Sequence, residues 1–226
     1  MGFKIRTETG ERRVGIFGGT FNPIHLGHLR GAEEIRESFG LAEVTFVQAA
    51  VPPHKGTGGM ADAAHRLEMV RLAIRTNPCF TASDIELKRT GKSYSIDTIR
   101  YFRETHRGPL FFILGGDAFG EIETWKEFET LFSLCHFIVM TRPLSGKNGD
   151  GFGLPESLTP FFRYDQVAQA WIHASGNRLS LKEITFLDIS STRIRKGIER
   201  GESVRYLVAA ETEAYIRAKG LYQKSD

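Results

Sequence analysis

The feature that most constrains the fold is a strand-like run that ends in two glycines and is followed by a helical pattern. Residues 12–17 predict a strand, because this apolar run stops at Gly18 and Gly19. Pro23 excludes a helix at its own position, and apolar residues recur at helical spacing from His25 onward. A strand, a glycine turn and a helix in this order can direct the amides of the helix start toward a phosphate.

Two histidines give this segment its chemistry. His25 and His28 are three residues apart at the start of the predicted helix, so we expect them to share one face. Beside a phosphate-binding turn, two imidazoles suggest donors to phosphoryl oxygens. The alternatives are a solvated or capping histidine, or half of a metal site. Zinc requires three or four ligands, and the nearby sequence offers no third.

The composition indicates one domain of moderate charge. With 226 residues and 41% hydrophobic content, the chain can form one substantial core, which we assign to residues 12–226, after a flexible N-terminus at 1–11. The net charge is +3 and the charges are interspersed, which argues against a nucleic-acid partner. Cys79 and Cys135 are expected to be buried, reduced thiols. No signal peptide or membrane span is expected, and we predict a cytoplasmic protein.

Strand and helix patterns alternate along the rest of the chain, which predicts an α/β fold, a doubly wound, mostly parallel sheet. Residues 144–180 are rich in glycine and proline and are expected to form a variable loop or insertion, interrupted by a short helix at 166–174. The further strands are predicted at 43–48, 80–87, 110–114, 134–141 and 183–187, and the further helices at 61–76, 95–102, 190–201 and 204–216.

Polar and aromatic residues follow several of these strands, where open α/β sheets bind ligands. Lys55 lies in a loop after the second strand, where a solvated charge is the ordinary interpretation. Ser95 is predicted to cap a helix. Asp117, just past a strand, can accept hydrogen bonds from a ribose or cap a helix, and Trp125 can stack on a flat ring or belong to the core.

A second anion site is predicted where a run of hydroxyl residues opens a basic helix. Ser190, Ser191 and Thr192 precede or begin this helix, whose free amides attract anions. Thr192 and Arg195 are three apart and share a face, whereas Arg193 points elsewhere. We therefore expect Arg195 to be the phosphate-binding arginine. A capped basic helix without a ligand is the alternative.

Five segments, in order, resemble a known family. GGTFNPIHLGH and ISSTRIR resemble the motifs of the HxGH nucleotidyltransferase superfamily. PPHK, KSYS and GGD followed by Trp125 resemble those of the bacterial nicotinate mononucleotide adenylyltransferases. Asn22 stands where many members have Asp, and either side chain can cap the following turn. The resemblance implies a Rossmann-like fold and transfer of AMP from ATP to nicotinate mononucleotide, giving deamido-NAD and pyrophosphate.

The resemblance also implies roles for particular residues. His25 and His28 would be catalytic, and Mg²⁺ would accompany ATP. Rivals are phosphopantetheine or nicotinamide mononucleotide as acceptor, or a binding-only regulator, and a homo-oligomer is left open. The residues implied for ATP and its phosphates are Gly18, Gly19, Thr20, Lys55, Ser190, Ser191, Thr192 and Arg195; those implied for nicotinate mononucleotide are Ser95, Asp117, Trp125, Lys126 and Arg142.

Overall fold

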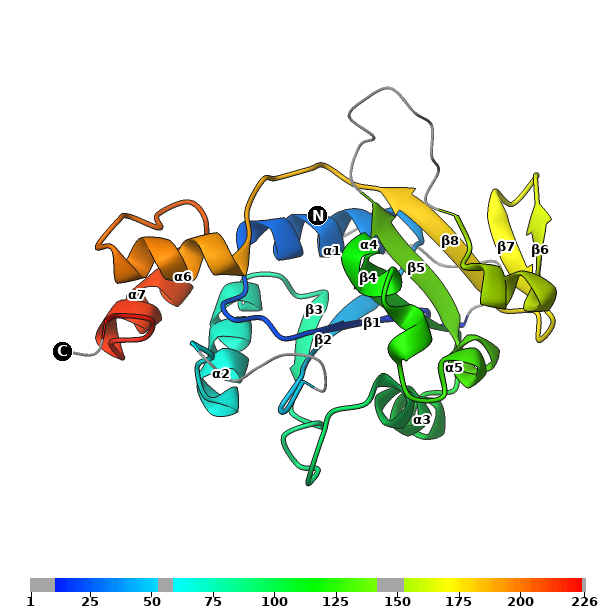
Figure 1. The fold of residues 1–226 in the computed structure, drawn as a ribbon, viewed down its shortest axis with the longest axis horizontal. Coiled ribbons are helices and arrows are strands. Elements are labelled where there is room, and N and C mark those ends of the chain that lie inside the picture. Colours follow the sequence, from blue (N-terminus) through cyan, green and yellow to red (C-terminus); the bar gives the residue numbers. More distant parts are fainter. Residues whose placement is uncertain (1–10, 53–58, 142–152, 225–226) are drawn as a thin grey trace.

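A computed structural model describes residues 11–52, 59–141 and 153–224. Its strands form one sheet in the order β3-β2-β1-β4-β5-β8-β7-β6 (Figure 1). Neighbouring strands from β3 to β8 are parallel, and only β7 and β6 add antiparallel pairs at the edge. The predicted doubly wound, mostly parallel sheet is confirmed. The strands are β1 (Val14–Gly19), β2 (Glu43–Gln48), β3 (Phe80–Ser83), β4 (Leu110–Gly115), β5 (His136–Thr141), β6 (Phe162–Asp165), β7 (Ala170–His173) and β8 (Arg178–Glu183).

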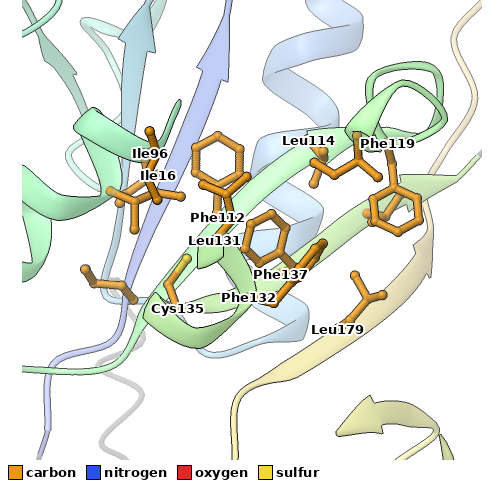
Figure 2. Packing of buried hydrophobic residues seen from close by; sticks show 14 of the residues in the cluster. Ile16, Ile96, Phe112, Leu114, Phe119, Leu131, Phe132, Cys135, Phe137 and Leu179 are labelled. Atoms are coloured by element: carbon orange, nitrogen blue, oxygen red, sulfur yellow. The ribbon is translucent and has the colours of Figure 1, made fainter. Parts of the chain in front are cut away.

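Helices cover both faces of the sheet, because the central strands are apolar on both sides. In β4, Phe112 and Leu114 pack on one face with α3 and α5, as Figure 2 shows, while Phe111 and Ile113 pack on the other with α1 and α2. The α-helices are α1 (Leu26–Ser38), α2 (Ala63–Ile74), α3 (Ser95–Thr105), α4 (Gly116–Phe119), α5 (Phe128–Leu134), α6 (Ser191–Glu199) and α7 (Ala210–Ala218), and two 3₁₀ helices are η1 (Ile122–Thr124) and η2 (Glu156–Phe161). In the described ranges, no helix has the length and apolar character needed to cross a bilayer.

The region predicted as a loop, 144–180, contains regular structure. Its described part forms η2, β6, β7 and the start of β8, so the predicted loop and the helix at 166–174 are wrong. The hairpin formed by β7 and β8 is stabilised by packing, because Ala170 and Leu179 are buried. Gly176 turns the chain between these two strands with a φ of +89°. The last strand is β8 rather than 183–187, because the alternation of Leu179 and Leu181 with polar residues fits a strand buried on one face.

Three other predicted boundaries move. The strand predicted at 80–87 ends at Ser83, because Asp84 opens a turn whose carbonyl accepts from Leu87. The strand predicted from 134 begins at His136, since α5 takes the preceding apolar residues. The helix predicted at 204–216 begins only at Ala210, after a turn with left-handed backbone.

Candidate active site

Two adjoining cavities lie at the carboxyl ends of the central strands. Both are lined by the same four residues, Gly18, Gly19, Thr20 and Gly115, which end β1 and β4. The first cavity continues toward α3 and η1, and the second continues toward α1 and α6. Ligands bound in the two cavities would therefore meet at the glycine turn after β1.

The glycine turn is shaped by a close ring contact. A Cβ atom at Gly19 would lie 2.7 Å from the ring of Phe21, a distance that only glycine avoids. Phe21 itself has a φ of 44°, in the left-handed region, and its ring is buried. Strain of this kind persists where the surrounding structure enforces it. The Phe21 ring therefore requires glycine at position 19, in the turn that lines both cavities.

Asn22 holds this turn to distant parts of the chain. Its Nδ2 donates to the carbonyl of Gly59 at 3.3 Å, and its Oδ1 accepts from the amide of Ala61 at 3.1 Å and the hydroxyl of Tyr222 at 2.7 Å. Burial raises the pKa of Tyr222, so its hydroxyl remains protonated and donates. Asn22 could also have capped the turn that follows it, and its side chain is used in these longer-range bonds instead.

Arg66 is a residue that the sequence reasoning missed. Arg66 is 1% exposed, and within the described part of the chain its guanidinium group donates to backbone carbonyls. It reaches Thr20 at 3.0 Å, Ala49 at 2.6 Å, Ala50 at 2.9 Å and Ala61 at 2.8 Å. A single buried cation therefore fixes the glycine turn, the end of β2 and the approach to α2 in one arrangement.

His25 and His28 lie together, as predicted, but in different environments. Their rings stack with centroids 3.6 Å apart. His25 is 7% exposed, and burial lowers its pKa to about 4, so the ring is neutral near pH 7. Its Nδ1 has no hydrogen-bond partner among the described residues. His25 does not line the second cavity, whereas His28 does.

The tautomer of His28 follows from a backbone bond. The amide of His25 donates to Nδ1 of His28 at 3.2 Å, so a neutral His28 carries its proton on Nε2. The ring of His28 packs edge-on against Phe21, 5.2 Å between centroids. His28 is therefore fixed with one nitrogen as acceptor and the other as donor, beside the cavity that it lines.

One donor at the start of α1 is already occupied, because the amide of Leu26 donates to the carbonyl of Leu207 at 2.9 Å. The expected binding of phosphate at this helix start remains a prediction. Gly27 has a different function: a Cβ atom there would lie 3.1 Å from Nδ1 of His25. Glycine between the histidines thus allows the His25 ring to lie against the helix.

The start of α6 supplies the hydroxyl groups and the cation of the second cavity. Ser191, Thr192 and Arg195 all line it. Arg195 donates from Nη1 to the carbonyl of Asn22 at 2.8 Å and reaches Thr192 Oγ1 at 3.5 Å, which brings α6 against the turn. Ser191 donates to the carbonyl of Pro23 at 2.8 Å.

Two neighbours on the same helix have other partners. The hydroxyl of Ser190 accepts from the amide of Arg193 at 3.2 Å and caps α6, and Ser190 does not line either cavity. Arg193 pairs with Asp188 at 2.7 Å on the exposed side. Arg195 lines the second cavity and Arg193 does not, and the choice of Arg195 as the phosphate-binding arginine remains a prediction.

Three of the residues predicted to bind nicotinate mononucleotide line the first cavity, namely Ser95, Trp125 and Lys126. Tyr94 is the N-cap of α3 and Ser95 its first residue, so the prediction of Ser95 as the cap is wrong. Lys126 Nζ lies 3.6 Å from Asp97 and 4.9 Å from the centre of the Tyr94 ring. Ser95 thus presents its hydroxyl at the positive end of an eleven-residue helix.

The remaining predicted residues are placed differently. Trp125 packs edge-on against Phe112, with centroids 6.2 Å apart, and still lines the cavity. Asp117 is exposed in the first turn of α4 and does not line either cavity. Lys55 and Arg142 lie outside the described residues. Within the described part of the chain, no group of three or more His, Cys, Asp or Glu side chains could hold a metal ion.

A family model described as cytidylyltransferase-like matches residues 16–197, which include both cavities' shared wall, both histidines and α6 up to Gly197. The chain belongs to the cytidylyltransferase-like family.

Curated relatives of this cytidylyltransferase-like chain carry a more specific name. A protein of Citrifermentans bemidjiense is 46% identical over 211 residues, which cover 93% of this chain and 98% of that protein. One of Desulfatibacillum aliphaticivorans is 42% identical over 215 residues, covering 93% and 99%. Both are named probable nicotinate-nucleotide adenylyltransferase. The family resemblance predicted from the motifs is confirmed.

Solved structures support the fold of this cytidylyltransferase-like chain. The nicotinic acid mononucleotide adenylyltransferase of Plasmodium falciparum, complexed with NaAD, superimposes with a TM-score of 0.70 at 21% identity. The comparison covers 93% of this chain and 97% of that one. The same enzyme complexed with APC gives a TM-score of 0.68, also at 21% identity and with the same coverage. At this identity the likeness concerns the fold.

Sequence reasoning missed Glu86 as well as Arg66. Glu86 is buried, lines the first cavity and bonds to Thr98 of α3. One signal was present in the sequence: a single arginine inside the apolar stripe of the helix predicted at 61–76 is a buried polar candidate. Glu86, in a segment predicted as a strand, gave no comparable signal.

Proposed function

We propose that this protein transfers AMP from ATP to nicotinate mononucleotide, giving deamido-NAD and pyrophosphate. The observation that carries the proposal is the pair of cavities that share the glycine turn after β1. A reaction that joins two nucleotides through their phosphates needs two sites meeting at one phosphate position. The names of the curated relatives and the NaAD in the Plasmodium falciparum complex support the same reaction.

ATP takes the second cavity in this proposal. Its polar groups suit a triphosphate: amides of the glycine turn, the hydroxyl of Thr192 and the guanidinium of Arg195, while Ser191, whose hydroxyl donates to a backbone carbonyl, completes the wall. Arg195 already lies against the turn through the carbonyl of Asn22. Charge and hydroxyl donors therefore surround one side of the space next to His28.

The mononucleotide takes the first cavity. A pyridine ring would lie between the apolar wall and Trp125, and its carboxylate would receive hydrogen bonds at the start of α3. Ser95 and Lys126 provide a hydroxyl and a cation there, which favours the acid over the uncharged amide.

The reaction would require positioning and charge stabilisation more than proton transfer. The phosphate of the mononucleotide is an anion at neutral pH, so an oxygen lone pair attacks the α-phosphorus of ATP without a general base. A bond forms from that oxygen to phosphorus, and the bond to pyrophosphate breaks. His28 would donate from Nε2 to an α-phosphate oxygen as charge accumulates, while neutral His25 holds its ring in place by stacking.

A divalent cation would accompany the triphosphate, and we propose Mg²⁺. The described residues contain no cluster of metal-ligating side chains, which fits a metal ion that arrives with the triphosphate. Mg²⁺ keeps several waters and binds well to substrate phosphates. When bound, it would neutralise part of the triphosphate charge.

We also propose a cytoplasmic location and small-molecule substrates as partners. Support comes from the two free cysteines, of which Cys135 is buried. The deciding experiment for the function measures pyrophosphate release from Mg-ATP with either nicotinate mononucleotide or nicotinamide mononucleotide. Strong preference for the acid is expected. Release with phosphopantetheine alone, or ATP binding without release, would contradict the proposal.

A further inference from the structure

Glu86 lies in the wall of the first cavity with no part in the transfer described above. It follows β3 in a turn, its side chain is 7% exposed, and burial raises the pKa of its carboxyl group. Burying a carboxyl group is unfavourable unless it is hydrogen-bonded. The hydrogen bond of Glu86 to Thr98 joins two segments that line the same cavity.

The hydrogen bond between Thr98 and Glu86 fixes the start of α3. Thr98, buried in the first turn after Ser95, donates from Oγ1 to Oε1 of Glu86 at 2.5 Å. The same hydroxyl accepts from Nη1 of Arg89 at 3.0 Å, and Nη2 of Arg89 donates to the carbonyl of Asp97 at 2.8 Å. The hydroxyl of Thr98 can therefore give its only hydrogen to Glu86.

Ser93, which lines the same cavity as Glu86, fixes the segment after β2. Its Oγ accepts from the amides of Ala50 and Val51, at 3.0 and 3.3 Å.

We propose that Glu86 is a positioning residue for the pyridine mononucleotide, because its carboxyl group holds the start of α3 against the turn after β3 through Thr98. It acts through Thr98 on Ser95 and on the neighbouring cavity wall, and does not itself contact the reacting atoms. The inference rests on the proposed function, since it assigns the first cavity to that substrate. ATP, in the second cavity, is bound by residues outside this network.

The test is steady-state kinetics of Glu86→Ala, varying each substrate in turn. The KM for nicotinate mononucleotide should rise about tenfold, because the start of α3 with Ser95 is no longer held in place through Thr98. The KM for ATP should stay within about twofold, and kcat at saturation should fall little. A purely structural carboxyl group would change the melting temperature without separating the two KM values.

Matched variants separate positioning from general destabilisation. Thr98→Val removes one donor, leaves the carboxyl group, and serves if Glu86→Ala does not fold; it should also raise only the mononucleotide KM. Thr212→Val removes a buried hydroxyl that donates to the carbonyl of Met69, far from both cavities. Glu33→Ala removes a carboxyl group that bridges Arg36 and Asn77. Both controls should lower the melting temperature and leave both KM values unchanged.

The outcomes distinguish the two proposals. A wild-type protein that forms no deamido-NAD overturns the proposed function and the role of Glu86 with it. An active wild type, with equal KM changes for both substrates or none in Glu86→Ala and Thr98→Val, overturns only the role of Glu86.

Discussion

The imidazole rings of His25 and His28 stack at 3.6 Å between centroids, with their planes inclined by 26°. The two residues have the same side chain and different surroundings, since His25 is buried and His28 lines the second cavity. In the proposed reaction, His25 would therefore act as a supporting ring and His28 as the donor to the substrate.

His28→Ala should reduce kcat on the order of a hundredfold, because it removes one donor to the charge that develops on the α-phosphate. The fold should be retained, since the ring lies at the cavity and not in the core. Turnover measured at saturating substrates tests this. His65→Ala, which removes the hydrogen bond to Tyr215 on α7, is the control and should keep kcat near the wild-type value. Unchanged turnover in His28→Ala would contradict the mechanism.

The stability of the protein should fall as the pH drops from about 6.5 to about 4. Folding lowers the pKa of His25 to about 4 from 6.5, so the unfolded chain binds a proton in this window while the folded chain does not. The contribution of neutral His25 to the free energy of unfolding is about 3 kcal/mol for such a shift. It is fully present above pH 6.5 and is lost as the pH falls through about 4. His136, with a pKa also lowered to about 4, adds to the same window.

Urea unfolding between pH 4 and 7 measures this dependence, and NMR titration of the ring protons assigns it. His25→Gln should flatten the pH dependence partly, leaving the share of His136. Titration of His25 near 6.5 in the folded protein would show that the burial argument is wrong.

Arg195→Ala should raise the KM for ATP by about tenfold or more, because it removes a charged donor beside the proposed triphosphate site. Arg193→Ala is a close control, two residues away on the same helix, since its guanidinium pairs with Asp188 on the exposed side. Its ATP KM should change little. Equal effects of the two substitutions would indicate a general electrostatic effect of the helix.

Lys126→Met should reduce the preference for nicotinate over nicotinamide mononucleotide about tenfold, because the cation near the first cavity favours a carboxylate. The ratio of kcat/KM for the two substrates is the measurement. Lys88→Met removes a lysine that pairs with Asp84 on the surface and should leave the ratio unchanged. A ratio unaffected by Lys126→Met would assign the discrimination to Ser95 and the helix start alone.

Gly27→Ala should lower kcat several-fold, because the new Cβ would lie 3.1 Å from Nδ1 of His25 and displace the stacked rings. Gly120→Ala adds a Cβ with ordinary contacts of 3.5 Å and should be tolerated. Steady-state kinetics of the two variants, with melting temperatures, separates crowding of the histidines from a general cost of substitution. Equal kcat values would contradict the argument.

The sequence predicted the parts of this protein that depend on local patterns. The strand, glycine turn and helix around His25 and His28 follow from periodicity and from glycine and proline, and the structure has them at nearly the predicted positions. The hairpin β6–β7 was missed because short edge strands bury few residues and their segment is rich in turn-forming residues.

Contacts between distant segments could not be read from the sequence. Asn22 was expected to act locally, and instead it bonds to residues near positions 60 and 222. Arg66 and Glu86 bind carbonyls or hydroxyls from other elements, and nothing in their own neighbourhoods indicates those partners. The predicted ligand roles of Lys55, Asp117 and Arg142 remain predictions.

The bond from the Tyr222 hydroxyl to Asn22 has a consequence for synthesis on the ribosome. The strands of the parallel sheet are complete at Glu183, about forty residues earlier in translation. A nascent chain can therefore assemble its sheet while the Asn22 side chain still lacks one of its three partners. Tyr222 must leave the exit tunnel before the turn at Asn22 is secured, so this turn is expected to become rigid later in synthesis than the sheet that carries it.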